Sequence, residues 1–333
     1  MKLSVVTTLY QSATTIGEFY RRAIRAAEAV TDDIELVMVN DGSADNSLQL
    51  AIALQQSDPR VVVVDLSRNF GHHKALMTGL AYATGDLVFL LDSDLQEQPE
   101  ALAAFYERLS KGDCDVIYGF QAQRSGGLFE RITGAVYYSL LDMLTDDKIP
   151  RNHMTIRLMT RAYVHAVVSH RDQEFVISQL FSMSGFRQVG LPTIKAPAVT
   201  RSYSLRGRIK LFVKHVTTTS TRLLFLIFFL GLALSCLAAA VIVYYLFRYI
   251  VFGVGVSGFT SLIVSLWFFG GLLTLILGIL SLYIANILVE TKRRPYTVVR
   301  QVYGGAEQPE PAGASGEPGY LPAGPTFLTR RLS

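Results

Sequence analysis

The feature that most constrains this chain is a long apolar stretch near its C-terminal end. Residues 223–289 carry one formal charge, on Arg248. Residues 223–247 are 25 uncharged residues, enough for one helix across a hydrocarbon core about 30 Å thick. A glycine-rich segment at 253–258 then precedes a second apolar run. The sequence therefore predicts a two-helix transmembrane hairpin over residues 223–290, with helices at about 223–247 and 262–288.

Basic residues flank this apolar stretch unevenly and predict its orientation. One lies between the two predicted helices, and the others precede or follow the pair: Arg201, Arg206, Arg208, Lys210, Lys214 and Arg222, then Lys292, Arg293, Arg294 and Arg300. Because positively charged flanks stay in the cytoplasm, both chain ends are expected there. Apolar residues at helical spacing further predict an amphipathic helix over 206–222 in the membrane interface. A buried hairpin in a large soluble protein is the alternative, which the charge asymmetry disfavours.

The first 205 residues mix charged and apolar side chains as a soluble domain does. Short β-rich runs alternate with helical patterns, which is typical of an α/β domain with a mostly parallel sheet. The predicted strands are residues 3–9, 34–40, 61–66, 87–91 and 116–120, and the predicted helices are residues 15–30, 46–56, 73–83 and 99–110. Residues 128–144 also have apolar side chains at helical spacing, and both core packing and membrane contact remain open for them.

Further sequence features indicate a cytosolic setting for the first domain. Residues 1–8 are too short and too polar for the core of a signal peptide. The two cysteines, Cys114 and Cys236, fall in unlike environments and are not expected to pair, which fits a reducing compartment. Residues 291–333 form a predicted cytosolic tail, with a candidate late strand at 296–303. Beyond Gly304 the tail is rich in Pro and Gly and is expected to be flexible.

Two carboxylates directly follow the predicted strand at 87–91. Asp92 and Asp94 would lie at the carboxyl end of a parallel strand, where open α/β sheets bind ligands. Hard oxygen ligands suit Mg²⁺ or Mn²⁺ bridging a diphosphate. A solvated turn is the ordinary interpretation of one such pair. However, polar segments at 40–43 and 67–74 also follow predicted strands, and turn chemistry does not account for this clustering.

Four motifs give the chain a family resemblance. They are Thr7-Thr8-Leu9-Tyr10, Asn40-Asp41-Gly42-Ser43, Asn69-Phe70-Gly71-His72 and Leu91-Asp92-Ser93-Asp94-Leu95-Gln96. With these motifs in this order before a late hairpin, the chain resembles family-2 glycosyltransferases of the GT-A fold. More narrowly, it is similar to dolichol-phosphate mannose synthases and bacterial undecaprenyl-phosphate glycosyltransferases, over roughly residues 1–300. The resemblance implies a Rossmann-like GT-A catalytic domain at 1–205.

The resemblance also implies roles for individual residues. The nucleotide and donor-phosphate site would include Thr8, Tyr10, Asp41, Arg68, Lys74, Asp92, Arg201 and Tyr203. Asp92 would face the donor sugar, and Asp94 with Gln96 would hold the divalent metal, Mg²⁺ or Mn²⁺. The catalytic groups would be Asp92, Asp94, Arg124 and Arg131, the two arginines lying near the acceptor phosphate. Arg157 would belong to the acceptor site. For each arginine, solvated surface charge is the alternative, and for Lys74 a solvated helix position.

Two positions depart from the family pattern. Thr155 stands where relatives often have an Asp before a Phe-Arg-Leu pattern, and Thr is no general base. A phosphate monoester with a second pKa of about 6 is largely dianionic near neutrality, so such an acceptor needs no base. Ser12 stands where many relatives have an acidic residue, which leaves the choice of nucleotide open.

The expected activity is therefore inverting transfer of a sugar from a nucleotide sugar to a polyprenyl phosphate, such as undecaprenyl phosphate, at the cytoplasmic membrane face. A UDP-sugar is expected in preference to a GDP-sugar. The expected location is the cell inner membrane, as a multi-pass protein with no nucleic-acid partner. The resemblance further implies a homo-oligomer such as a tetramer. Two alternatives remain: a glycolipid or polysaccharide synthase with a hydroxyl acceptor, and a non-catalytic nucleotide-sugar-binding membrane module.

Overall fold

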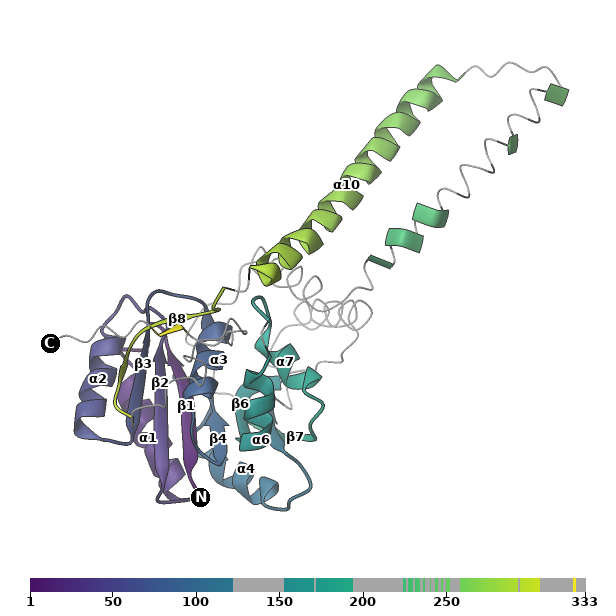
Figure 1. The fold of residues 1–333 in the computed structure, drawn as a ribbon. Helices are drawn as coiled ribbons and strands as arrows, with labels where there is room; N and C mark the ends of the chain where they lie inside the picture. Colours follow the sequence, from purple (N-terminus) through teal and green to yellow (C-terminus); the bar gives the residue numbers. More distant parts are fainter. Residues whose placement is uncertain are drawn as a thin grey trace, which may run out of the picture. The chain divides into compact units, whose positions relative to one another are not determined.

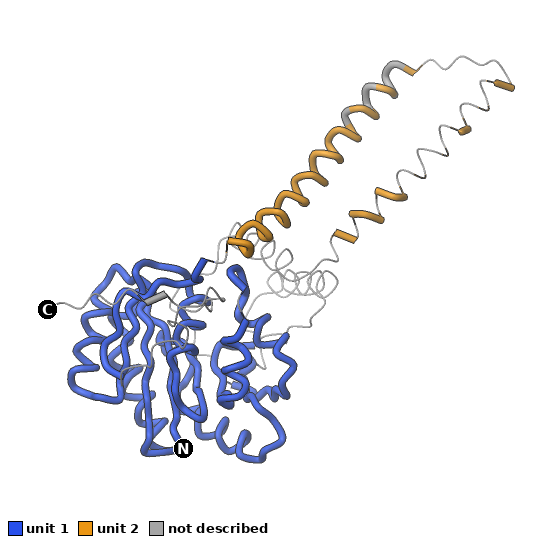
Figure 2. The backbone as a smooth tube through the Cα atoms, in the orientation of Figure 1, with its two compact units in different colours: residues 1–134, 147–203, 293–333 blue, residues 135–146, 204–292 orange. Residues whose placement is uncertain are grey.

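The computed structural model describes residues 1–121, 153–170, 172–193, 258–292, 294–305 and 326–327, together with scattered positions between 224 and 251. The chain divides into two compact units (Figure 2). We call residues 1–134, 147–203 and 293–333 the sheet domain, and residues 135–146 and 204–292 the helical unit.

The sheet domain begins with alternating strands and helices. In chain order these are β1 (Leu3–Leu9), α1 (Ile16–Glu28), β2 (Ile34–Asn40), α2 (Ser47–Ser57), β3 (Val61–Leu66), α3 (His72–Tyr82), β4 (Leu87–Leu90) and α4 (Ala101–Leu109). Strands β1 to β4 are parallel and lie in the order β4-β1-β2-β3. The predicted parallel α/β arrangement is confirmed, and the strand bounds agree with the prediction to within one residue.

Further strands extend this sheet on both sides to give nine in the described part of the chain, in the order β7-β5-β6-β4-β1-β2-β3-β8-β9. The added elements are β5 (Val116–Phe120), β6 (His153–Thr160), α6 (Arg161–Val168), α7 (Ile177–Met183), β7 (Gln188–Pro192), β8 (Val298–Tyr303) and β9 (Thr326–Phe327). β6 runs antiparallel to β4, and β8 runs antiparallel to β3. The predicted late strand is therefore confirmed as β8, whereas β6, α6, α7 and β7 were not predicted.

Helices cover both faces of the sheet (Figure 1). α1 packs against α2 and α4 on one face, and α3 packs against α6 and α7 on the other. Successive β1 residues alternate between the two resulting cores: Val5 belongs to the first and Val6 to the second. Burial on both faces explains why β1 and β2 lack the regular polar alternation of a half-exposed strand, and polar residues within them, such as Ser4, Thr7 and Glu35, are themselves buried.

The segment after the helical unit returns to the sheet domain. Tyr296 is 5% exposed and packs edge-to-face on Phe175. The hydroxyls of Thr297 and Thr78 lie 2.8 Å apart in the core, and the Arg300 guanidinium lies 3.5 Å from the Asp65 carboxylate. Residues 296–303 are therefore part of the packed domain, not of a loose tail.

The helical unit contains α10 (Phe259–Thr291), a helix of 33 residues. Its segment Phe268–Thr291 has a mean hydropathy of 2.4 and is, among the described residues, the one helix long and apolar enough to cross a membrane. α10 corresponds to the second predicted transmembrane helix. The described positions between 224 and 251 are helical, but 12 of the 25 residues of the first predicted helix lie outside the described residues, so the hairpin stays a prediction. The predicted helices at 128–144 and 206–222 also lie outside them.

Candidate active site

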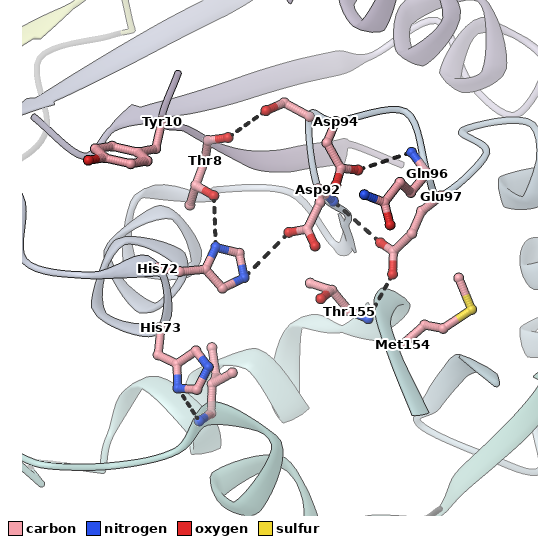
Figure 3. A network of polar contacts seen from close by, with 12 residues as sticks. Thr8, Tyr10, His72, His73, Asp92, Asp94, Gln96, Glu97, Met154 and Thr155 are labelled. Carbon is pink, nitrogen blue, oxygen red and sulfur yellow. Dashed lines mark hydrogen bonds and ion pairs between the residues drawn. The ribbon is translucent and has the colours of Figure 1, made fainter. Parts of the chain in front are cut away.

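The order of the strands creates a binding position at the carboxyl ends of β1 and β4. The chain moves outward from β1 through β2 to β3, and α3 then carries it back across to β4 on the other side of β1. Open α/β sheets bind ligands at such a reversal, outside the carboxyl ends of the strands. Thr8 and Tyr10 lie at the end of β1, and Asp92 and Asp94 follow β4 (Figure 3).

The loop after β4 is fastened to the end of β1 through Ser93. Its buried hydroxyl donates to the Thr8 carbonyl oxygen at 2.8 Å and lies 3.0 Å from the hydroxyl of Ser12. Leu95 in this loop has φ of 60°, and Gln11 after β1 has φ of 55°; these are the two non-glycine residues with positive φ in the described chain. Such backbone conformations cost about 1 kcal/mol or more and cluster at functional sites.

The two carboxylates of this loop differ in exposure. Asp94 is exposed, and its Oδ1 accepts the Gln96 backbone N–H at 3.0 Å. The Asp92 side chain is 27% exposed, and its Oδ1 lies 3.5 Å from Nε2 of His72. The predicted residues Thr8, Asp92, Asp94 and Gln96 are thus brought together at one end of the sheet (Figure 3).

Glu97 is a residue of this site that the sequence analysis missed. It is 2% exposed, and its carboxylate accepts the Thr155 N–H at 2.8 Å and the Asp92 N–H at 3.4 Å. Glu97 thereby joins the loop after β4 to the start of β6. A third acidic residue three positions after Asp94 was visible in the sequence, but β6 was not predicted, so its partner was unknown.

His72 is the second residue that the sequence analysis left without a role. It is the first residue of α3, and its Nδ1 lies 3.3 Å from the Thr8 hydroxyl while its Nε2 faces Asp92. His72 therefore lies between the ends of the two strands that flank the reversal. It was present in one of the quoted motifs, but only the fold places its ring beside Asp92.

Asp41 was predicted to contact the nucleotide, and the structure gives its carboxylate two backbone partners. It is 2% exposed, and its oxygens accept the N–H groups of Phe70 and Gly71 at 2.7 and 3.1 Å. Burial raises the pKa of Asp41, and these two hydrogen bonds oppose that rise. In this conformation the Asp41 carboxylate therefore holds the loop between β3 and α3.

Gly42 makes a close backbone approach to the same loop. Its φ is +59°, and a Cβ at this position would lie 2.4 Å from the Asn69 backbone nitrogen. An L side chain at position 42 would force the two loops apart. The close contact between the loops after β2 and β3 therefore explains why the second motif has glycine at position 42.

Three other residues that were predicted to contact the nucleotide lie at or close to the surface at this end of the domain. Tyr10 is 53% exposed. The Arg68 guanidinium lies 4.2 Å above the centre of the Phe70 ring. Lys74 Nζ donates to Glu174 Oε1 at 3.0 Å, so in this conformation it is part of an ion pair between α3 and the segment before α7. Their roles in nucleotide binding stay predictions.

Arg157, predicted in the acceptor site, is buried in this structure. It is 3% exposed, and its guanidinium lies 3.6 Å from the centre of the Phe181 ring. It donates to the carbonyl oxygens of Met154 and Thr155 at 3.4 and 3.3 Å, and burial lowers its pKa. These contacts stabilise the start of β6. Of the remaining predicted residues, Arg124, Arg131, Arg201 and Tyr203 lie outside the described residues.

The residues present fit a divalent cation that is shared with a diphosphate. Asp94 offers an exposed carboxylate, and Gln96 lies in the same loop. Within the described residues, no three His, Cys, Asp or Glu side chains are grouped so as to enclose a metal ion. Mg²⁺ and related cations are commonly held by one or two carboxylates together with substrate phosphates. The exposed Asp94 carboxylate could serve as one such ligand.

Asp45 connects the loops that follow β1 and β2. It accepts hydrogen bonds from the hydroxyls of Ser43 and Ser47 at 2.5 and 2.6 Å, and from the N–H groups of Ala13 and Ser47 at 3.1 Å each. Burial acts to raise the pKa of Asp45, but these bonds outweigh it and lower the pKa to about 2. The ionised form is therefore stabilised by folding.

This network predicts a pH dependence of stability. A carboxyl group whose pKa is lowered by folding stabilises the protein above its unfolded pKa, about 3.9, and stops doing so as the pH falls through its folded pKa, about 2 for Asp45. Asp45→Asn should lower the thermal unfolding midpoint at pH 7, and its difference from wild type should shrink between about pH 4 and 2. The measurement is thermal unfolding in detergent across this range, with exposed Asp32→Asn as the control. A difference that does not change with pH would contradict the assignment.

Comparison with known proteins identifies relatives over most of the chain. Residues 4–168 match the family model for glycosyl transferase family 2. A Mycobacterium tuberculosis protein whose name describes glycosyltransferases is 43% identical over 304 residues, 91% of this chain and 89% of that one. A prophage bactoprenol glucosyl transferase homolog of Escherichia coli is 30% identical over 305 residues, 91% of this chain and 99% of that one.

Among solved structures, a mannosyltransferase from Pyrobaculum calidifontis in complex with GDP-Man and Mn²⁺ aligns with a TM-score of 0.47. It is 18% identical to this chain, and the alignment covers 88% of this chain and 86% of that one.

Proposed function

This chain belongs to the family 2 glycosyltransferases, and from that premise we propose that it transfers a sugar from a nucleotide sugar to a polyprenyl phosphate, with inversion at the anomeric carbon. The observation that carries the proposal is the pair Asp92 and Asp94 at the carboxyl end of β4, next to Thr8 at the end of β1. The acceptor class is supported by the Escherichia coli relative, which is named as a bactoprenol glucosyl transferase homolog.

In this proposal the loop after β4 binds the donor. Asp94 and Gln96 would hold Mg²⁺ or Mn²⁺, and the cation would supply positive charge that neutralises the departing nucleoside diphosphate. Asp92 faces the sugar, and Thr8 and Tyr10 contact the nucleotide, which we take to be a uridine diphosphate. Arg201 and Tyr203 complete the donor-phosphate site, because an arginine pairs bidentately with phosphate.

The chemical step is a single displacement. An oxygen of the lipid phosphate forms a bond to the anomeric carbon while the bond from that carbon to the diphosphate oxygen breaks, and the nucleoside diphosphate leaves with the electron pair. The acceptor is largely dianionic near neutrality, so no general base is required and Thr155 at the base position is tolerated. The protein contributes positioning and electrostatic stabilisation.

The acceptor side of the proposal depends on the membrane. A polyprenyl chain stays in the bilayer, so the enzyme must be held at the membrane surface. α10 supplies one apolar helix of sufficient length, and its side chains are exposed, Leu266 by 69% and Phe268 by 62%. We assign the first crossing to residues 223–247, the interface helix to 206–222 and the acceptor phosphate to Arg124 and Arg131. Arg157 would act there only if β6 rearranges, and assembly as a homo-oligomer is part of the same proposal.

An acceptor assay tests the proposed function directly. Purified protein in detergent is given labelled UDP-sugars with Mn²⁺ or Mg²⁺ and either undecaprenyl phosphate or diacylglycerol. We expect a lipid-soluble labelled product from undecaprenyl phosphate alone, and we expect mild acid to release the sugar, because a glycosyl phosphate is acid-labile. An acid-stable product from diacylglycerol would favour the hydroxyl-acceptor alternative. Failure to transfer any sugar to either lipid would reject the proposed function.

A further inference from the structure

Three successive side chains in the first turn of α3 contact three different parts of the sheet domain. His72 lies between Thr8 on β1 and Asp92 after β4. His73 Nδ1 accepts the backbone N–H of Ile177, at the start of α7, at 3.4 Å. Lys74 pairs with Glu174. Of these three residues, His72 is the one directed at the carboxylate pair.

Asp92 is held from two directions in this arrangement. Its backbone N–H is directed at Glu97, and its Oδ1 faces Nε2 of His72 at 3.5 Å. This separation is at the limit for a hydrogen bond, and because a carboxylate only accepts, such a bond would have Nε2–H of His72 as its donor. In a neutral imidazole the other nitrogen then accepts, so the Thr8 hydroxyl donates to Nδ1 at 3.3 Å. The two contacts together fix the plane of the His72 ring.

The backbone also holds His72 in place. α3 begins after Gly71, whose φ of 98° turns the chain into the helix, and the Gly71 N–H is bound by the buried Asp41 carboxylate. His72 therefore has a fixed main chain, and its side chain, 45% exposed, lies between Thr8 and the Asp92 carboxylate, which is 27% exposed. A ring nitrogen facing Asp92 Oδ1 favours the carboxylate orientation that keeps this contact.

We propose that His72 is a positioning residue that orients Asp92 toward the donor sugar. This inference rests on the proposed function, because it assigns Asp92 to the sugar. It predicts that losing the His72–Asp92 contact impairs the reaction of the sugar and not the binding of the nucleotide. A misplacement of about 1 Å at a reacting centre can lower the rate about 10²-fold, which sets the scale of the expected effect.

Two substitutions test the roles of the two ring nitrogens of His72 one at a time. The amide of His72→Gln reaches about as far as Nε2 and can still donate to Asp92, whereas the shorter amide of His72→Asn reaches the Nδ1 position and can contact only Thr8. We expect His72→Asn to lower kcat about 10²-fold and His72→Gln to retain most of it. The matched control is His73→Asn, whose amide oxygen can replace Nδ1 as acceptor for the Ile177 N–H and which should behave like wild type.

The assay measures kcat and KM for the sugar donor, and calorimetry measures binding of UDP, which lacks the sugar. UDP affinity should be unchanged in His72→Asn. The effect should also disappear in an Asp92→Asn background, because a residue that acts through Asp92 has nothing further to lose there.

The outcomes distinguish this inference from the proposed function. If wild type transfers no sugar, the proposed function fails and His72 has no reaction to support. If wild type is active while His72→Asn equals His73→Asn, the positioning role is wrong. An equal loss in His72→Asn and His72→Gln, or a parallel loss of UDP affinity, would assign His72 to folding or nucleotide binding and would also overturn the inference.

Discussion

Asp94→Ala is expected to lower sugar transfer by at least about 10²- to 10³-fold while the protein still folds and enters the membrane. Removing one group that stabilises transition-state charge typically has an effect of this size. Asp94 is exposed, and within the described part of the chain its side chain accepts one hydrogen bond, from the nearby Gln96 N–H, so the folded domain should tolerate its loss. The measurement is initial rate with undecaprenyl phosphate over a range of Mn²⁺ or Mg²⁺ concentrations.

The control for this prediction is a carboxylate at the other end of the strands. Asp32 is exposed and precedes β2, so it lies opposite the carboxyl ends of the parallel strands. Asp32→Ala should transfer sugar like wild type, and both variants should show the wild-type thermal midpoint. Undiminished turnover by Asp94→Ala would remove this residue from the metal site and return the Asp92-Ser93-Asp94 segment to an ordinary turn.

Glu97→Ala is expected to impair both stability and activity. The substitution leaves the N–H groups of Asp92 and Thr155 without their carboxylate partner in a region where Glu97 itself is 2% exposed. Each unsatisfied buried donor costs about 1–3 kcal/mol, so the loss of a partner for both donors should lower the free energy of unfolding by about 2–6 kcal/mol. Because the loop after β4 is then no longer joined to β6, transfer should fall about 10²-fold or more.

Two further variants make the Glu97 prediction specific. Glu97→Gln keeps the volume but presents an amide N–H₂ to one of the two backbone donors, so it should retain the fold better than Glu97→Ala and still lose activity. Glu100 is three residues further along, with a side chain 54% exposed that forms a bidentate pair with Arg22. Glu100→Ala loses only an exposed ion pair, worth about 0–1 kcal/mol. A wild-type rate in Glu97→Gln would show that this carboxylate has no influence on the site.

Much of the sheet domain could be predicted because short segments of the sequence carry the patterns of its strands. The strands β1 to β3 are rich in Val, Leu and Ile, and their predicted bounds agree with the structure. The antiparallel strand β6 was missed although it pairs with both β4 and β5. Its residues include the buried Arg157 and a run of mixed polarity, so the apolar pattern that identified the other strands is absent. What makes β6 a strand is its position between two neighbours.

The candidate site was likewise predictable in part, where its residues belong to short local patterns. The sequence by itself determined the α/β class, the apolar helix and the carboxylates after β4, because hydropathy and turn residues are properties of short segments. Only the tertiary structure decided that Glu97 joins the loop after β4 to β6, that Asp41 binds the loop before α3, and that His72 faces Asp92. These contacts join residues that are 20 to 58 positions apart, and pairing at such separations depends on strand order and register, which no local pattern encodes.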